Sequence, residues 1–108
     1  MGPAPSLMRD LKFFRGQLAR ALGPVDVVLL FGSQARGDSG RDSDVDVLVV
    51  SQAFEGRNHF DRASQLRRLW ELPYPVDFLC YTPEEFEHRR SQVGIVRVAL
   101  EEGVAVES

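Results

Sequence analysis

Three aspartates stand at the start of apolar runs, where a charged side chain is costly to bury. Asp44 and Asp46 open one such run, and Asp77 lies just inside another. Side chains alternate along a strand, so Asp44 and Asp46 would share one face. Like charges this close repel each other, and burial of either one alone is unfavourable. We therefore expect a positive charge between them.

The chemistry that suits such a cluster is metal-dependent phosphoryl transfer. Mg²⁺ is a hard cation that prefers oxygen ligands and keeps positions open for substrate phosphates. Two such ions can stabilise both the attacking and the leaving oxygen of a phosphoryl transfer. Ser33, expected at the start of a short helix, brings backbone N–H groups that suit a triphosphate. In outline, these residues predict a nucleotide-transfer site.

Other readings of the loop between these residues fail on their spacing. Gly32 and Gly37 have the glycine spacing of a phosphate-binding loop, but Asp38 stands where that loop needs a lysine. A dinucleotide-binding glycine fingerprint is missing, as are the central glycine and final glutamate of a calcium loop. Asp and Ser also cluster in ordinary turns. That reading explains the loop, but it does not explain Asp46 inside a run of valines.

The elements that must position these residues alternate between helix and strand. Ser6 is expected to cap a first helix that Gly23 and Pro24 end, and Ser33 to cap a short helical turn. A helix over residues 58–72 should turn Phe60, Ala63, Leu66 and Leu69 or Trp70 inward. Strands are expected over residues 25–31, 44–50 and 76–81, with a short edge strand over 104–106.

The last third of the chain is expected to be mainly helical. Thr82, Pro83 and Glu85 form a capping-box sequence, which predicts a helix start. Helix should then continue to about Glu102, with a break near Gly94. Together these elements predict a mixed α/β (α+β) fold, a single domain over residues 1–108 with a loose tail at 1–5.

The motif itself resembles a known family. Gly32-Ser33, followed after ten residues by Asp44 and Asp46, resembles the signature of the DNA polymerase β-like nucleotidyltransferase superfamily. With Asp77 further along, the pattern is similar to the minimal nucleotidyltransferase (MNT) branch. The resemblance implies that Asp44, Asp46 and Asp77 bind divalent metal, two Mg²⁺ ions that Mn²⁺ can replace. It also implies that Asp77 helps to activate the acceptor hydroxyl as a general base.

The same resemblance assigns the phosphate-binding residues. Gly32 and Ser33 are expected to hold the β- and γ-phosphates. Arg36 matches an arginine of the family, and two roles stay open for it: contact with phosphate, or pairing with a loop carboxylate such as Asp42. Because Gly32 ends one strand and Asp44 begins the next, and both must meet one nucleotide, those strands should be antiparallel. The strand that carries Asp77 should be parallel to the strand that carries Asp46, with a helical crossover between them.

The resemblance further implies a function. Nucleotidyl transfer, AMP from ATP or another nucleoside triphosphate, would go to a hydroxyl with release of pyrophosphate. Minimal members are commonly encoded beside a helical HEPN protein, so we expect an antitoxin that adenylylates a tyrosine of its HEPN-type toxin. Two alternatives stay open: modification of a small molecule, as in aminoglycoside nucleotidyltransferases, and silencing of a toxin by binding alone. We expect a partner, or a second copy of the chain in a homo-oligomer, to supply the acceptor.

Composition excludes several other classes. A formal net charge of −3 argues against bulk nucleic-acid binding, and no apolar run approaches a membrane span. Cys80 is the only cysteine, which fits a reducing cytoplasm. His59 and His88 are expected on the surface, and Trp70 in the core or facing a partner. The pairs Arg67-Arg68 and Arg89-Arg90 are read as solvated helix faces, with a docking patch as the alternative.

Overall fold

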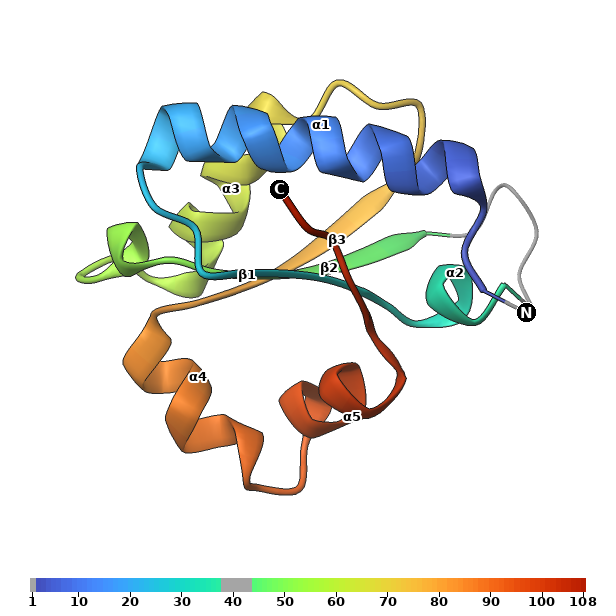
Figure 1. The fold of residues 1–108 in the computed structure, drawn as a ribbon. Coiled ribbons are helices and arrows are strands. Elements are labelled where there is room, and N and C mark those ends of the chain that lie inside the picture. The colour runs from blue at the N-terminus through green and yellow to red at the C-terminus, as the bar shows by residue number, and fades with distance from the viewer. Residues whose placement is uncertain (1, 38–43) are drawn as a thin grey trace.

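In the computed structural model, which describes residues 2–37 and 44–108, a mixed sheet of four strands lies between two layers of helices (Figure 1). Helices α1 and α3 cover one face of the sheet, and α4 and α5 cover the other. In chain order the elements are α1 (Pro5–Leu22), β1 (Val27–Phe31), α2 (Ser33–Arg36), β2 (Val45–Val50), the 3₁₀ turn η1 (Gln52–Phe54), α3 (His59–Leu69), β3 (Val76–Tyr81), α4 (Pro83–Arg90), α5 (Ile95–Glu102) and β4 (Val104–Ala105).

The strand arrangement confirms the expected topology. The order across the sheet is β3-β2-β1-β4, with β1 antiparallel to β2 and β2 parallel to β3. Parallel neighbours need a crossover connection, and α3 lies in that connection. The expected edge strand is present as β4, which pairs antiparallel with β1. Mixed pairing therefore brings the end of β1, the start of β2 and the start of β3 to the same end of the sheet.

Alternation along β2 divides the core in two. Val45, Val47 and Val49 point into the core beneath α1 and α3, whereas Leu48 and Val50 pack on the α4 and α5 side. Because side chains alternate along a strand, Asp46 belongs to the same face as Leu48. The aspartates of interest therefore lie on the α4 and α5 side of the sheet.

The first helix buries one apolar face against the sheet but begins earlier than expected. Leu7, Leu11, Phe14 and Leu18 are buried against the sheet. The predicted cap at Ser6 is wrong: the helix begins at Pro5, with Ala4 at the cap position. Proline suits the first helical position because the N–H it lacks would have no partner in the helix. Among residues 2–37 and 44–108, no helix is long and apolar enough to cross a membrane.

Helix α3 ends at Leu69, three residues before the predicted end, and it also differs from its prediction in one buried residue. Asn58 caps it by accepting a hydrogen bond from the Asp61 N–H, and Leu66 is buried as expected. Phe60 was expected to face inward, but 75% of it is exposed. Arg62 takes the inward position and is only 3% exposed. The apolar spacing predicted the wrong orientation for Phe60 because a buried, paired arginine cannot be told from a solvated one in the sequence.

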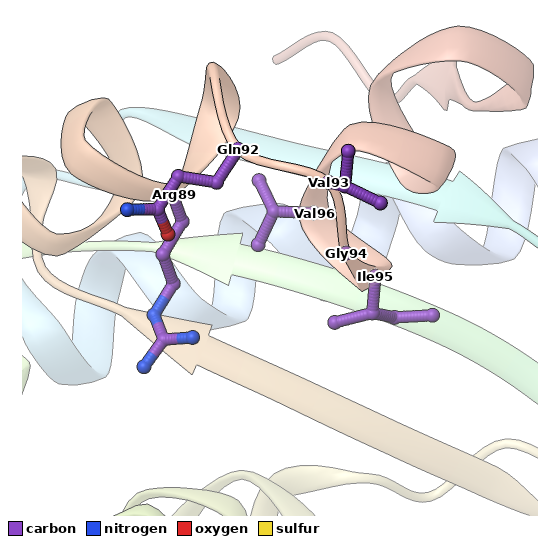
Figure 2. A pocket seen from close by; sticks show the side chains of 6 residues that line it. All are labelled: Arg89, Gln92, Val93, Gly94, Ile95 and Val96. Carbon is purple, nitrogen blue, oxygen red and sulfur yellow. The ribbon is translucent and has the colours of Figure 1, made fainter.

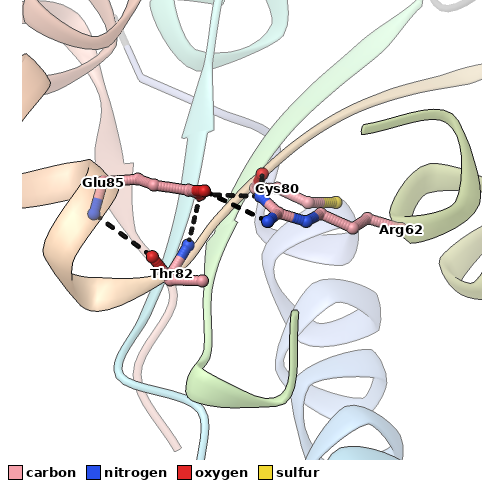
Figure 3. Close-up of polar contacts among 4 residues, drawn as sticks. All are labelled: Arg62, Cys80, Thr82 and Glu85. Carbon is pink, nitrogen blue, oxygen red and sulfur yellow. Dashed lines mark hydrogen bonds and ion pairs between the residues drawn. The ribbon is translucent and has the colours of Figure 1, made fainter. Parts of the chain in front are cut away.

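Arg62 is buried because its guanidinium has partners on two neighbouring elements (Figure 3). Its Nη1 donates to the Cys80 carbonyl at 3.0 Å and to Glu85 at 2.6 Å, and Nη2 donates to the second Glu85 oxygen at 3.1 Å. Glu85 also accepts from the Thr82 N–H, and Thr82 accepts from the Glu85 N–H, which completes the predicted capping box. The interaction thus joins α3, β3 and the start of α4.

The remaining expectations for the core and the last helices are confirmed. Trp70 packs edge-on against Phe14 and Phe78, with ring centroids 4.9 and 5.6 Å away, so it is a partly buried residue that packs against the core. Its indole N–H donates to the Tyr74 carbonyl at 2.9 Å. The predicted break near Gly94 separates α4 from α5, with Gly94 at the cap of α5.

Candidate active site

Gly32 and Asp46 are in direct contact where β1 ends and β2 begins. Phe31 is paired with Asp46 across the sheet, so the turn after β1 passes beside that carboxylate. Gly32 has φ +76°, and a Cβ built on it would collide with Asp46 Oδ2. The Asp46 carboxylate therefore occupies the space that any other residue at position 32 would fill. Glycine is required here both by the backbone angle and by this close approach.

Asp77 lies directly beside Asp46. The two residues are paired in the parallel register of β2 and β3, where neighbouring strands are about 4.8 Å apart. Asp44, just before β2, is expected on the same face because it is two residues from Asp46. Asp44 and Asp77 are exposed to solvent, and Asp46 is partly buried. The register thus brings the three aspartates predicted from the sequence to one edge of the sheet.

The electrostatics of Asp46 reflect this crowding. Burial raises the pKa of the Asp46 carboxyl, and the nearby charges of Asp77, Asp44 and Glu102 raise it further. Each of these carboxylates disfavours a second negative charge beside it. A bound cation would relieve that repulsion, and oxygen donors are the ligands that Mg²⁺ prefers.

The carboxylates do not form a finished ligand shell. Among the described residues, no three His, Cys, Asp or Glu side chains are placed to hold a metal ion together. The donor types and the excess negative charge at Asp46 fit a divalent cation. Exposed side chains such as Asp44 and Asp77 can change rotamer readily. The metal roles of the three aspartates stay a prediction.

Two residues of the phosphate motif lie in and beside a short helix. Ser33 is the first residue of α2, and Gly32 takes the cap position that was expected for Ser33. Gly32 has a positive φ, a conformation that suits glycine, and this turn comes directly before the helix. The cap therefore falls one residue earlier than expected. Gly37 ends α2 in a left-handed conformation, and a Cβ there would collide with the backbone of Gly2. Part of the predicted loose tail therefore packs against the end of α2.

Glu102 is a member of this region that sequence reasoning missed. It is the last residue of α5, and its Oε1 accepts from the Gly32 N–H at 3.2 Å. Both of its carboxylate oxygens lie 3.1 Å from Arg36 Nη1. One of the two roles left open for Arg36 was pairing with Asp42, which lies outside the described residues. Within the described residues, Glu102 is an ion-pair partner of Arg36.

No local signal marks Glu102 in the sequence, because it ends an ordinary amphipathic helix. Its contacts with Gly32 and Arg36 span separations of 70 and 66 residues. Only the pairing of β4 with β1, which fixes the end of α5 beside Gly32, brings it there.

The other residues singled out in the sequence lie away from the carboxylates. His59 is exposed, with its ring 5.7 Å from that of Tyr81, and His88 is an exposed residue of α4. Arg89 and Arg90 lie over the rings of Tyr81 and Phe86, at 5.4 and 5.5 Å from the ring centroids. These contacts are within the chain, so for Arg89 and Arg90 they favour a solvated helix face over a docking patch.

A small pocket lies at the connection between α4 and α5 (Figure 2). None of the three aspartates and neither residue of the phosphate motif lines it. It is therefore separate from the predicted site. Its lining residues are Arg89, Gln92, Val93, Gly94, Ile95 and Val96.

Comparison with known proteins identifies the family. The nucleotidyltransferase domain family matches residues 11–106, so the chain belongs to that family. A crystal structure of a "putative nucleotidyltransferase" from Sulfolobus solfataricus is similar to this fold, with a TM-score of 0.64 and 26% sequence identity. The similarity covers 91% of this chain and 77% of the other. No curated protein matches the sequence. The mixed sheet and its flanking helices are thus those of a nucleotidyltransferase fold.

Proposed function

We propose that this nucleotidyltransferase transfers AMP from ATP onto a hydroxyl of a partner protein, a tyrosine of a HEPN-type toxin, and so acts as an antitoxin. The single observation that carries the proposal is the contact of Asp46 with Gly32, beside Asp77 in register. This arrangement brings the predicted metal-binding carboxylates against the predicted phosphate-binding turn. We propose that residues 1–108 form one domain for this task.

In the proposed reaction, the acceptor oxygen forms a bond to the α-phosphorus of ATP, and the bond from that phosphorus to the bridging oxygen breaks. Pyrophosphate leaves, and Asp77 accepts the proton of the acceptor hydroxyl. Asp77 suits this role because it is exposed at the edge and can be reached from outside. Asp44, Asp46 and Asp77 would hold Mg²⁺, which supplies charge neutralisation for the phosphates when bound.

The remaining groups orient the nucleotide. The Gly32 N–H and the Arg36 guanidinium are hydrogen-bond donors that suit phosphate oxygens. Gly32 is held against Asp46, so its N–H has a fixed position relative to the carboxylates. Fixed donors on the triphosphate favour transfer because they lower the entropy cost of aligning the α-phosphorus with the acceptor.

The exposure of Asp44 and Asp77 bears on the source of the acceptor. A site open to water holds a small hydroxyl compound poorly, and its reaction is slow without a second surface to align the acceptor. We therefore propose that a helical partner protein covers the carboxylate edge, the end of the sheet that carries Asp44, Asp46 and Asp77. The partner would present its tyrosine to Asp77. This arrangement favours a protein acceptor over an antibiotic-like small molecule.

The test is transfer of label from [α-³²P]ATP in the presence of Mg²⁺ and the protein encoded beside this chain. The partner should acquire covalent AMP, and Asp46→Asn and Asp77→Asn should each reduce its labelling at least a hundredfold. Asp26→Asn is the matched control, because Asp26 is an exposed carboxylate at the opposite end of β1. It should label the partner at the wild-type rate.

Three results would contradict the proposal. Efficient labelling of an aminoglycoside by the chain alone would favour the small-molecule reading. Silencing of the toxin by Asp46→Asn and Asp77→Asn, without any labelling, would favour inhibition by binding. Equal labelling by wild type and Asp46→Asn would show that the carboxylate edge is not the site.

A further inference from the structure

The end of α5 places a carboxylate on the donors that the proposed reaction needs for phosphate. Glu102 Oε1 accepts the Gly32 N–H, and the carboxylate forms an ion pair with Arg36. These donors are therefore already bound to an anion that belongs to the chain itself. The side chains of Arg36 and Glu102 are 46% and 28% exposed, so this ion pair is open to solvent on one side.

A phosphate oxygen and this carboxylate compete for the Gly32 N–H, and both are attracted to the Arg36 guanidinium, of which Nη1 contacts Glu102. The Gly32 backbone contributes a single N–H, and a carboxylate and a phosphate are both anions that accept from it. Glu102 is also close enough to raise the pKa of Asp46, so its charge adds to the repulsion among the aspartates. Departure of Glu102 would therefore both release donors for a phosphate and remove a negative charge near Asp46.

The backbone that carries Glu102 is fixed by packing and strand pairing, whereas its side chain is partly exposed. The next residue, Gly103, leaves no room for a Cβ, which would collide with the Ala99 carbonyl oxygen. Immediately afterwards, Val104 pairs with Leu30 in the sheet. Movement of Glu102 away from Gly32 therefore needs rotation of its side chain and no unfolding of α5. Such rotations of partly exposed side chains are fast.

We infer that Glu102 is a built-in competitor of the nucleotide: its carboxylate occupies the donors at Gly32 and Arg36 and must swing away when a triphosphate binds. The inference rests on the proposed function, because it takes those donors to be the phosphate-binding groups. It makes affinity for the triphosphate lower than the donors alone would give. It also makes Glu102 a residue that sets how strongly a nucleotide is retained before the partner arrives.

The test is the dissociation constant of Mg²⁺·ATP, measured by calorimetry with the full chain. Glu102→Gln should bind at least fivefold more tightly than wild type, because a neutral amide competes less well for Arg36. Glu101→Gln is the matched control: Glu101 is the preceding residue, exposed, and pairs with Arg97 at 3.7 Å. It should bind within twofold of wild type. Circular dichroism checks that both variants keep the fold.

A second variant separates competition from positioning. If Glu102 served to hold Arg36 in place for phosphate, Glu102→Gln would weaken binding in the same direction as Arg36→Gln. Competition instead predicts opposite effects: Arg36→Gln weakens binding and Glu102→Gln strengthens it. Unchanged or weaker binding by Glu102→Gln overturns the inference.

The outcomes for the inference and for the proposed function are distinct. Tighter binding by Glu102→Gln together with no AMP transfer to any acceptor would support the competitor role and overturn the proposed transfer. Transfer by wild type with equal binding by Glu102→Gln would overturn only the competitor role. Failure of wild type and every variant to bind Mg²⁺·ATP would overturn both.

Discussion

Gly32 is the residue that most constrains the site, because two independent requirements meet there. Its backbone has φ +76° and ψ −161°, a combination that is available essentially only to glycine. A side chain would also displace the Asp46 carboxylate. The glycine of the motif is therefore explained by geometry, whatever the nucleotide.

Gly32→Ala is expected to destabilise the protein by about 1–3 kcal/mol, the usual cost of a residue in that backbone region. It should also abolish AMP transfer, because Asp46 must move. The measurement is urea unfolding together with the labelling assay.

Gly16→Ala is a control of opposite sign: Gly16 lies within α1, and a Cβ there would meet Arg20 at an ordinary distance of 3.9 Å. It should raise stability by about 0.5–1 kcal/mol. Equal effects of the two substitutions would contradict this account of Gly32.

Among the elements, α3, β3 and α4 are joined by one buried arginine. Arg62 binds the Cys80 carbonyl and both Glu85 oxygens, and Glu85 also belongs to the capping box of α4. Loss of Arg62 would leave the Cys80 carbonyl without this donor and the Glu85 carboxylate without its cation. Such losses are costly because a buried polar group without a partner pays its full desolvation penalty.

Arg62→Met is expected to lower the free energy of unfolding by roughly 1–3 kcal/mol, less than for a fully buried pair because water can still reach Glu85. Arg67→Met, an exposed arginine of the same helix, should change it by less than about 0.5 kcal/mol. Urea unfolding of both variants checks the difference. If Arg62→Met were as stable as Arg67→Met, the ion pair would not stabilise the packing of these elements.

The pH dependence of stability should report the same interaction. Hydrogen bonding from Arg62, opposed by burial and helped by the Thr82 N–H, lowers the pKa of Glu85 from 4.5 to about 2. Because the pKa is lower in the folded state, Glu85 contributes stability that is complete above pH 4.5 and is lost as the pH falls towards 2.

The difference in unfolding free energy between wild type and Glu85→Gln should therefore be constant from about pH 6 to 8 and shrink steadily below pH 4.5. Since the Glu85 side chain is 37% exposed, solvent screening should keep its magnitude to about 1–2 kcal/mol. Denaturant titrations at several pH values measure it. A difference that grows as the pH falls would reverse the assigned sign. When Arg62→Met is the background, the difference in unfolding free energy that Glu85→Gln causes should depend little on pH.

For the molecule as a whole, the negative charge gathered at one sheet edge links stability to metal. Asp46 is disfavoured as an anion by burial and by its carboxylate neighbours, so the folded chain without metal carries a local electrostatic cost. A cation that binds only the folded state stabilises it by mass action.

Mg²⁺ should therefore raise the melting temperature, by an amount equivalent to about 2.7 kcal/mol at a hundredfold excess over Kd, and ATP should raise it further. Asp46→Asn should abolish that rise while leaving the metal-free protein at least as stable as wild type. Asp26→Asn, at the other end of the sheet, should keep the rise. Thermal unfolding with and without Mg²⁺ provides the measurement. An identical response of wild type and Asp46→Asn would place the metal elsewhere.

Local sequence determined much of this molecule. The β-branched runs predicted the three main strands, Thr82 and Glu85 predicted the start of α4, and the glycine and aspartate spacing predicted the family motif. These signals are readable because strand alternation, capping and tight turns depend on residues a few positions apart. Together with the requirement that one nucleotide meet both strands, the motif predicted the antiparallel and parallel pairing that the sheet has.

The tertiary structure alone decided the features that depend on distant contacts. Arg62 is buried in place of Phe60 because it pairs with Cys80 and Glu85. These partners lie 18 and 23 residues further along the chain, so no local pattern marks the pairing. Glu102 reaches Gly32 only because β4 returns along β1 and fixes the end of α5 there. Periodicity treats any charged residue as solvent-facing, since it cannot register a partner far along the chain. The fold thus followed from local patterns, while the ion pairs that join its elements followed from packing.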